Sequence, residues 1–391
     1  MAWRLFLWCW TAISALWWGL SLHCARAGAP RRPPRKRKGS KTLSLFRPIP
    51  KIRSPQEYER LRDALFSLLS QLDSGCQLLL GIPREDACLW TDAIQLLEAS
   101  ECGASFQILF EPDPFPYRNP KILWQRSLAK FAKGELWVWT DGDVCLPSHF
   151  LHVVREDFEA CRRGFVTYPY VIRGVDNARD FWEAAWVNVE LFPGVCLLGR
   201  MDRVWFGLGA GMVFLGKKWE RASLWDKLGK SLADDFVLAQ TLKPGALGSV
   251  VLETFPRSLT LREALARYLR WKKTVRWCSP AGFAGQILIL PMIGWTVALF
   301  LNWHEPQNWM GWLCVVVGES LWFLSIFRAV RAHLPKRLYR LLPLWSYLRT
   351  FSWLLCWLPW PVAWDRQWWP CPVDKSSLLD QRVSLKRKGT G

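Results

Sequence analysis

The order of apolar and polar positions divides the chain into membrane segments and one α/β domain. Residues 3–25 form an apolar run of about the 20 residues that a helix needs to cross a bilayer. Apolar runs at 281–303 and 309–326 are separated only by the sequence HEPQN, which predicts a helical hairpin with a short turn. A last apolar segment at 341–364 contains Arg349 and several prolines, so it either spans the membrane or lies in its interface.

Basic segments border these runs. Residues 26–41 carry eight Lys or Arg and no acid, and such residues collect on the cytoplasmic side of membranes. They favour an uncleaved anchor over the alternative, a signal peptide cleaved near Ala25-Arg26-Ala27. The predicted organisation is an anchor at 1–25, a basic linker at 26–41, a cytoplasmic catalytic domain at 42–279, membrane or interfacial helices at 280–364 and a basic tail at 365–391.

Within residues 42–279, short apolar runs alternate with helical spacing. Strands are predicted at 42–49, 76–82, 105–112 and 135–141. Their apolar residues are too continuous for a sheet with one wet face, so helices are expected on both sides. Helices are predicted from Pro55, capped by Ser54, and from Asn119 to Gly134. The alternation of strand and helix predicts a mostly parallel sheet with right-handed crossovers.

Composition supports a membrane protein. The chain has 391 residues, 51% of them hydrophobic, with 28 Trp and a formal net charge of +19. Trp at the membrane interface and Lys or Arg on the cytoplasmic side explain both features. Nucleic-acid binding is disfavoured, because the basic residues lie beside apolar spans. The twelve cysteines form no Cys-x-x-Cys pair, so neither a zinc site nor a disulfide framework is expected.

Acidic residues follow the predicted strands, and parallel sheets bind ligands at the carboxyl ends of their strands. Asp86 follows the second strand, and Asp141 and Asp143 follow the fourth. Asp234 and Asp235 begin a predicted helix. Asp86 could instead be a helix cap. The pair at 234 and 235 could instead be first-turn acids that favour the helix dipole.

The sequence Asp141-Gly142-Asp143 is harder to explain structurally. Two carboxylates on one short loop repel each other, which is costly unless a cation neutralises them. Carboxylate oxygens suit Mg²⁺ or Mn²⁺ that also holds phosphate oxygens.

Two other segments admit a structural and a functional interpretation. Residues 264–277 are dense in Arg, Lys and Trp. The structural interpretation is a basic helix on an anionic lipid surface. The functional interpretation is that arginines of this helix also stabilise a diphosphate leaving group. The glycine-rich run from Gly207 to Gly211 is either a flexible turn or a close approach of the backbone to a ligand.

Together these features resemble the ceramide glucosyltransferases of glycosyltransferase family 21 and the related bacterial glycosyltransferases that modify hopanoid lipids. That family has three spaced aspartates followed by a (Gln/Arg)-x-x-Arg-Trp motif. The matching positions here are Asp86, Asp141, Asp235 and the segment from Arg267 to Trp271. The Asn-Pro-Lys sequence that begins at Asn119 also resembles a family segment.

The resemblance implies a glycosyltransferase-A fold and an inverting transfer of sugar from a UDP-sugar, most simply UDP-glucose, to a lipid hydroxyl. It implies that Asp86 contacts the uridine and that Lys121 is an additional nucleotide contact. Asp141 and Asp143 are expected to hold Mn²⁺ or Mg²⁺ on the diphosphate. Asp235 is expected to be the catalytic base.

The same resemblance gives roles to the motif before the hairpin. Arg267 and Arg270 are expected at the donor diphosphate, and Trp271 is expected to shape the site where sugar and acceptor meet. The acceptor is expected to be ceramide. The alternatives are a hopanoid, diacylglycerol or polyprenyl-phosphate acceptor, or a scaffold without enzyme activity that binds anionic lipid. The catalytic domain is expected in the cytoplasm, at a bacterial inner membrane or an ER or Golgi membrane.

Overall fold

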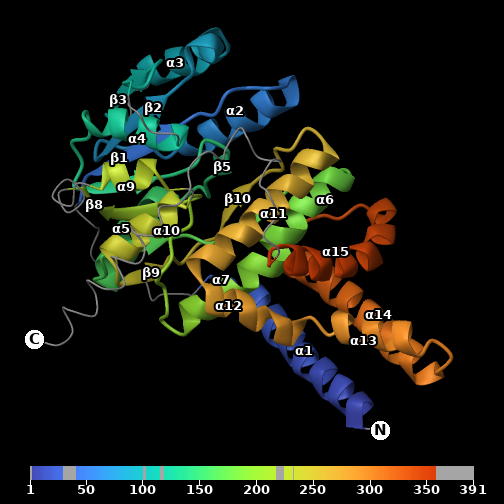
Figure 1. The fold of residues 1–391 in the computed structure, drawn as a ribbon. Helices are drawn as coiled ribbons and strands as arrows, with labels where there is room; N and C mark the ends of the chain where they lie inside the picture. The colour runs from blue at the N-terminus through green and yellow to red at the C-terminus, as the bar shows by residue number, and fades with distance from the viewer. Residues whose placement is uncertain are drawn as a thin grey trace, which may run out of the picture.

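The computed structural model describes residues 2–29, 41–99, 103–114, 119–216, 224–231 and 233–357. An α/β domain lies at one end of the molecule, and long apolar helices extend from it at the other (Figure 1). Most of the predicted basic linker and all of the predicted basic tail lie outside the described residues.

A seven-stranded sheet forms the core of the α/β domain, in the order β3-β2-β1-β4-β8-β6-β9. The four predicted strands are present and parallel: β1 (Leu43–Pro48), β2 (Cys76–Gly81), β3 (Ser105–Leu109) and β4 (Leu136–Trp139). The other three are β8 (Met212–Leu215), which is antiparallel to its neighbours, β6 (Phe165–Thr167) and β9 (Gly245–Leu247). A smaller sheet contains β5 (Val144–Cys145), β10 (Leu252–Thr254) and β7 (Tyr170–Ile172). The predicted α/β class is therefore confirmed.

Two predicted helices cover this sheet, and their starts follow the sequence signals. Helix α2 (Pro55–Leu69) begins after Ser54, whose side chain accepts a hydrogen bond from the backbone N–H of Glu57. Helix α4 (Pro120–Ala129) begins after Asn119. The predicted end of α4 at Gly134 is wrong, because the helix stops at Ala129. Gly134 is required for a different reason, since a Cβ there would lie 2.5 Å from the backbone carbon of Leu43.

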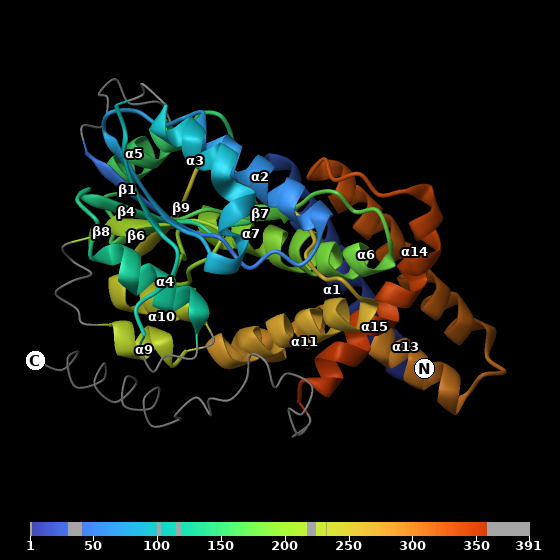
Figure 2. The same ribbon diagram turned by 90° about the horizontal axis from the view of Figure 1, so that it is seen from above.

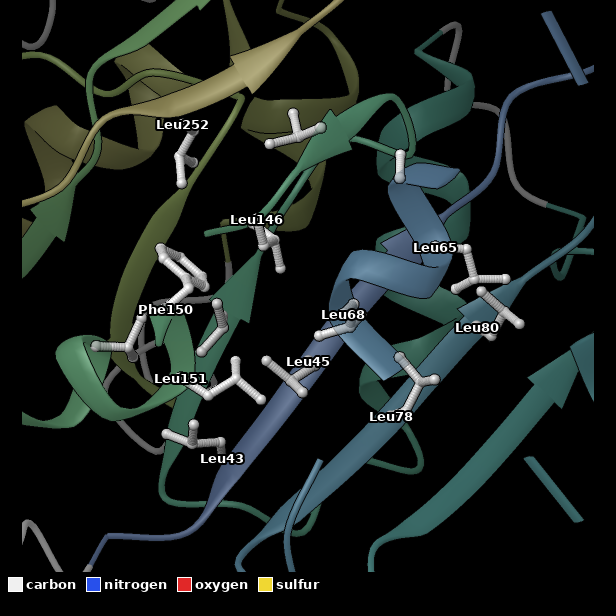
Figure 3. Packing of buried hydrophobic residues seen from close by; sticks show 14 of the residues in the cluster. Leu43, Leu45, Leu65, Leu68, Leu78, Leu80, Leu146, Phe150, Leu151 and Leu252 are labelled. Atoms are coloured by element: carbon white, nitrogen blue, oxygen red, sulfur yellow. The ribbon is translucent and has the colours of Figure 1, made fainter. Parts of the chain in front are cut away.

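Leucines of β1, β2 and α2 fill one face of the sheet together with residues of α5 (Phe150–Cys161) (Figure 3). This packing is dry and dense, and it fixes the positions of the strand ends relative to one another. The remaining helices around the sheet are η1 (Arg84–Trp90), α3 (Thr91–Glu98), α9 (Trp225–Gly229) and α10 (Asp234–Leu242).

A helical layer connects the sheet to the apolar helices. It contains α6 (Ala178–Ala184), η2 (Ala185–Leu191), α7 (Phe192–Arg200) and α11 (Leu261–Cys278). Figures 1 and 2 show α11 running beside α6 and toward α15 (Leu342–Leu355). Their buried residues share one hydrophobic cluster with α14 (Pro306–Ala329). The α/β domain and the apolar helices therefore pack as one body.

Two described helices are long and apolar enough to cross a membrane, α1 (Ala2–Ala27) and α14. The predicted span at 281–303 is not one straight helix, and by length and composition it can cross a membrane only as a bent pair of helices. That segment forms α12 (Pro280–Gly285), η3 (Gln286–Ile289) and α13 (Met292–Leu301), and the two halves are bent by 55°. Pro291 lies at the bend and cannot donate a backbone hydrogen bond there. The turn predicted at residues 304–308 is present but lies slightly earlier, at residues 302–305 between α13 and α14.

The described part of the last apolar segment is too short to span. Helix α15 has 14 residues, a length of about 21 Å at 1.5 Å per residue. A bilayer core is about 30 Å thick. The short helix η4 (Lys336–Leu341) precedes it, and α15 packs against α14.

Helix α1 supplies hydrogen bonds that the broken span needs. Backbone carbonyls without a partner are costly in a membrane. The indole N–H of Trp10 donates to the carbonyls of Ile287 and Leu288, each at 3.1 Å, and the Ser14 hydroxyl donates to Leu288 at 3.2 Å. Further contacts of α1 are Arg4 with Glu305, Thr11 with Trp295, and Ser21 with Trp322, each at 2.8 Å. These contacts favour a retained anchor.

The Trp10 contacts give a stability prediction. Trp10→Phe keeps an aromatic ring but removes the donor to both carbonyls at the break, so the free energy of unfolding should fall by about 1–3 kcal/mol. The measurement is the thermal midpoint of the purified protein in detergent. Trp3→Phe on the same helix is the control, since Trp3 is 51% exposed. Equal midpoints for the two variants would show that α1 does not stabilise the break.

Candidate functional site

Three parallel strands end at one edge of the sheet and place the candidate residues there. Pro48 of β1 pairs with Gly81 of β2, and Phe46 of β1 pairs with Trp139 of β4. The chain leaves β4 through Thr140 and the aspartate pair and then enters β5. The aspartates therefore lie where a parallel sheet binds its ligand.

Gly142 explains why a glycine separates the two aspartates. A Cβ at this position would lie 2.6 Å from the backbone oxygen of Pro48 and 2.6 Å from the ring of Pro50. The loop after β4 crosses directly over the end of β1, and only glycine leaves room for that crossing. The Asp-Gly-Asp sequence thus holds both carboxylates close to the sheet edge.

The Asn-Pro-Lys sequence begins helix α4 and places the Lys121 side chain beside these carboxylates. The Asn119 side-chain oxygen accepts from the N–H of Lys121, while its Nδ2 donates to Asp234 Oδ1 at 3.2 Å. Pro120 occupies the first helical position, where no N–H is needed. Lys121 Nζ lies 2.6 Å from Asp141 Oδ1 and 3.8 Å from Asp234 Oδ2. Asn119, Pro120 and Lys121 therefore each have a separate structural role.

Asp235 is the fourth carboxylate of this group, which we call the acidic centre: Lys121, Asp141, Asp143, Asp234 and Asp235. It lies in the first turn of α10, where its Oδ1 accepts from the N–H of Phe236 at 2.8 Å. Its Oδ2 accepts from the N–H of Gly209 at 2.9 Å. Burial, with the neighbouring Asp234 charge, raises the pKa of Asp235 to about 7. That value is suitable for accepting a proton at neutral pH.

Gly209 touches the middle of the acidic centre. A Cβ there would lie 2.9 Å from Lys121 Nζ, 3.2 Å from Asp141 Oδ2 and 3.6 Å from Asp235 Oδ2. Gly207 is also constrained, since its Cβ would lie 2.4 Å from the backbone oxygen of Asp235. The glycine-rich run is therefore a close approach of backbone to the charged groups of the acidic centre. Its approach to a ligand stays a prediction.

Cations are interleaved with the carboxylates. Burial disfavours the Lys121 charge, but Asp141 and Asp234 outweigh that effect and raise the pKa of Lys121. Burial raises the pKa of Asp141, and Lys121 opposes this increase. Arg257 lies 3.9 Å from Asp143 and is held by Glu57 at 2.7 Å. The centre therefore combines negative charge with fixed positive charge.

Arg47 adds a cation beneath the aspartate loop. Its side chain is fully buried in β1, and it donates to the Thr140 hydroxyl and to the backbone oxygens of Ala64 and Val144. Burial lowers the pKa of Arg47 to about 10, and the Asp143 charge limits the decrease. Arg47 thus anchors both ends of the loop from within the sheet.

The arginines and tryptophan of the predicted motif lie on α11. Arg267 Nε is 3.0 Å from Glu183 Oε1, and the Arg267 guanidinium lies 5.9 Å from the Trp271 ring. Trp271 stacks on Trp186 of η2 with ring centroids 6.4 Å apart. Arg270 lies on the same helix, one residue before Trp271.

Tyr170 links this motif to the acidic centre. Burial, with the charges of Asp141, Asp235 and Asp143, raises the pKa of Tyr170, and Arg267 opposes this increase. The hydroxyl of Tyr170 therefore lies within the electrostatic reach of both groups. Arg267 itself is paired with Glu183 of α6.

Asp86 stands apart from the acidic centre. It follows β2 in the first turn of η1, and its Oδ2 accepts from the N–H of Ile52 at 2.9 Å. It does not cap α3, which begins at Thr91 without a side-chain cap. Asp86 therefore lies along the same sheet edge as Asp141, separated from it by β1.

The carboxylates near Asp141 could supply only some of the ligands of a divalent ion. Within the described residues there is no group of three or more His, Cys, Asp or Glu that could hold a metal. Asp141 and Asp143 supply carboxylate oxygens, and Asp141 retains 37% side-chain exposure. Mg²⁺ is commonly bound by one or two carboxylates plus substrate phosphates. These two residues would therefore fit an ion whose remaining ligands come from a diphosphate.

Comparison with known families defines the class. The chain is a glycosyltransferase, since a glycosyltransferase family model matches residues 6–369, nearly its whole length. It belongs to glycosyl transferase family 21. The parallel-rich sheet and the flanking apolar helices agree with the glycosyltransferase-A fold expected from the resemblance.

Solved structures share the general arrangement at low identity. One is a mannosyltransferase from Pyrobaculum calidifontis in complex with GDP-Man and Mn²⁺, with 14% identity and a TM-score of 0.46, covering 91% of this chain and 96% of that one. Another is S. aureus TarS 1–349 in complex with UDP-GlcNAc, with 11% identity and a TM-score of 0.34, covering 87% and 92%. A search of curated proteins gave no match.

Several residues of the site were missed by sequence reasoning. Arg47 left a signal, because a charge interrupts an otherwise apolar strand. Asp234 was noticed but was not expected to contact Lys121. Tyr170 and Arg257 left no signal, since neither stands in a recognisable motif and both reach the centre through the tertiary fold.

Gly209 gives a direct test of the site. Gly209→Ala places a methyl group against Lys121 and Asp141, so we expect sugar transfer to fall about 100-fold, the cost of misplacing a catalytic group by about 1 Å. The thermal midpoint should change little, because the flexible end of Lys121 can move. Gly194→Ala is the control, since a Cβ there meets nothing within 4 Å. Transfer at the wild-type rate by Gly209→Ala would contradict the assignment of this centre.

Proposed function

We propose that this glycosyltransferase moves glucose from UDP-glucose to the primary hydroxyl of a membrane lipid, ceramide, with inversion at the sugar. The observation that carries the proposal is Asp235, a carboxylate with a pKa raised to about 7 beside the Lys121–Asp141 pair. An inverting transfer is a single displacement and needs one base. Asp235 takes the proton of the lipid hydroxyl as that oxygen attacks the anomeric carbon.

The donor lies along the sheet edge in this proposal. Asp86 contacts the uridine, at the end of β2, and Lys121, in the first turn of α4 beside Asp141, contacts the diphosphate. Asp141 and Asp143 hold Mg²⁺ or Mn²⁺ on the diphosphate, and such an ion offsets the charge that develops on the leaving group.

The motif on α11 completes the donor site. Arg267 and Arg270 face the diphosphate. A guanidinium group can donate two parallel hydrogen bonds to two phosphate oxygens at once. Trp271 shapes the site where the sugar meets the acceptor. The position of Tyr170, within electrostatic reach of both Arg267 and the acidic centre, supports this arrangement.

A lipid acceptor is supported by where the base lies. Burial, with the Asp235 charge, raises the pKa of Cys278 to about 12, so the last residue of α11 is near the base. The broken apolar segment begins immediately afterwards, at Pro280. A lipid leaves the bilayer at a cost of about 0.8 kcal/mol per exposed CH₂. A base at this point can reach a hydroxyl at the membrane surface without that cost.

The same geometry supports a multi-pass protein with a cytoplasmic domain. The N-terminal end of α1 and the α13–α14 turn lie together, opposite the α/β domain (Figure 1). Residues 26–29, the described start of the basic linker, and the basic segment at 328–340 both contact the domain side, through Arg200 with Gly28 and Arg337 with Asp176. This is expected for cytoplasmic segments in a bacterial inner membrane or an ER or Golgi membrane. Basic residues of α11 would then face an anionic lipid surface.

The substrate test is a panel of radiolabelled UDP-sugars with ceramide, hopanoid, diacylglycerol and polyprenyl phosphate in mixed vesicles. Transfer of glucose to ceramide is expected. A hopanoid or diacylglycerol product would change the acceptor and keep the reaction. A polyprenyl-phosphate product would remove the need for a base. Absence of both transfer and cation-dependent UDP binding would favour the anionic-lipid scaffold.

Asp235→Asn tests the mechanism. The variant should bind the UDP-sugar with unchanged affinity by calorimetry, while transfer falls roughly 100- to 10,000-fold, the usual contribution of a general base. Asp202→Asn, at an aspartate with 65% side-chain exposure, is the matched control. Wild-type turnover in Asp235→Asn would contradict the assignment of Asp235 as the base.

The pH profile gives a second measurement on the same variant. The base works only when deprotonated, so kcat/KM of the wild type should rise with pH and level off above about 7, where Asp235 loses its proton. In Asp235→Asn this rise should be absent. An unchanged profile would assign the base to another residue.

A further inference from the structure

Helix α11 has two functional faces. One carries Arg267, Arg270 and Trp271, the proposed donor residues. The other is buried at Ala264, Tyr268 and Lys272, which recur every four residues and so line one side of the helix. A lysine in this buried series is unexpected, because burying an ammonium group is costly without a partner.

Lys272 is bound by groups from two other helices. Its side chain is 1% exposed, and its Nζ lies 3.0 Å from Glu190 Oε2 of η2. It also donates to the backbone oxygen of Arg349 on α15 at 3.2 Å. The hydroxyl of Tyr268, one turn earlier, donates to the other oxygen of Glu190. Tyr268 and Lys272, the two polar residues of the buried face, therefore both bind the Glu190 carboxylate.

The contact continues into the apolar helices. The Arg349 guanidinium lies 2.8 Å from Glu319 Oε1 on α14, and both side chains are almost completely buried. Arg349 also lies over the rings of Trp322 and Trp345. A chain of buried polar contacts thus runs from η2 through α11 and α15 to α14.

The segment that supplies Glu190 is itself unusual. Residues 185–191 are a π-helix between α6 and α7, and π-helical segments are rare and frequent at functional sites. Within it, Trp186 stacks on Trp271 while Glu190 binds Lys272, so adjacent residues of α11 contact the same segment. An α-helix turns 100° per residue. A slip of α11 by one residue would therefore break both contacts together.

A buried ion pair is a weak source of stability but a strict determinant of position. Replacing both partners with apolar or neutral groups is often neutral or stabilising, whereas removing one partner leaves an uncompensated charge. An apolar contact tolerates rotation and sliding of a helix, but Lys272 has its carboxylate partner at one position only.

We propose that Lys272 and Glu190 are positioning residues, which fix the rotation of α11 and hold its donor-binding face toward the acidic centre. This inference rests on the proposed function, which makes the Arg267, Arg270 and Trp271 face of α11 the donor-binding face. The polar chain through Arg349 to Glu319 extends the fixation to the apolar helices. The position of the diphosphate site is thereby tied to the membrane-embedded part of the protein.

The test compares Lys272→Met, Glu190→Gln and the double variant E190Q/K272M in the full chain. The single variants should lower the thermal midpoint, because each leaves one buried charge alone. The double variant should recover the wild-type midpoint and still lose kcat at least about tenfold. The affinity for the UDP-sugar, measured by calorimetry, should change less than kcat. The exposed pair Lys130–Asp113, 2.7 Å apart, gives the control double variant K130M/D113N.

Hydrogen–deuterium exchange of α11 is the measurement that does not depend on activity. Faster exchange at residues 261–278 in the stable double variant supports the positioning role. A double variant with wild-type kcat and wild-type exchange would overturn it, and so would recovery of kcat together with the midpoint. If the wild type transfers no sugar to any acceptor, the proposed function fails, while the exchange result still decides whether the pair fixes α11.

Discussion

Repulsion among four carboxylates is the constraint around which the rest of the site is built. Asp141, Asp143, Asp234 and Asp235 lie near one strand edge, and like charges at this range disfavour ionisation. The fold brings cations from three separate elements to them: Lys121 from α4, Arg47 from β1 and Arg257 from the loop before α11. Asp235 has backbone N–H groups as its direct partners and keeps a raised pKa. The cations are therefore distributed unevenly, since Lys121 contacts Asp141 directly whereas Asp235 is bound by two backbone N–H groups.

The sheet edge and the apolar helices are joined through α11. Its start is capped by Thr260, whose side chain accepts from the N–H of Glu263, and its end is Cys278. The helix thus runs from the α/β domain to the broken segment. The Lys272–Glu190 pair and the Trp271–Trp186 stack hold it against η2. Chemistry on a lipid depends on such a connection, since the reacting groups and the membrane surface must keep a constant separation.

Local signals in the sequence predicted most of the fold and part of the site. The four parallel strands, the cap at Ser54 and the hairpin turn were predicted because each depends on neighbouring residues. The break at Pro291 was missed because hydropathy is uniform across it. The carbonyls freed there are satisfied by Trp10 and Ser14, almost 280 residues away.

The site shows the same division between local and distant information. The positions of Asp141 and Asp235 followed from motifs and strand ends. Their electrostatic neighbours did not, because Tyr170 and Arg257 come from distant parts of the chain and are set beside the aspartates only by the completed fold. Lys272 was visible as one lysine among many, and its burial is a property of helix packing.

The contacts of α1 also set the order in which the molecule can be completed. Ser21 and Trp322 are hydrogen-bonded although 301 positions separate them. Helix α1 is therefore made long before its partner α14, and the α/β domain is synthesised in between. The contact can form only after α14 has been made, so a chain that stops before α14 leaves the Ser21 hydroxyl without Trp322.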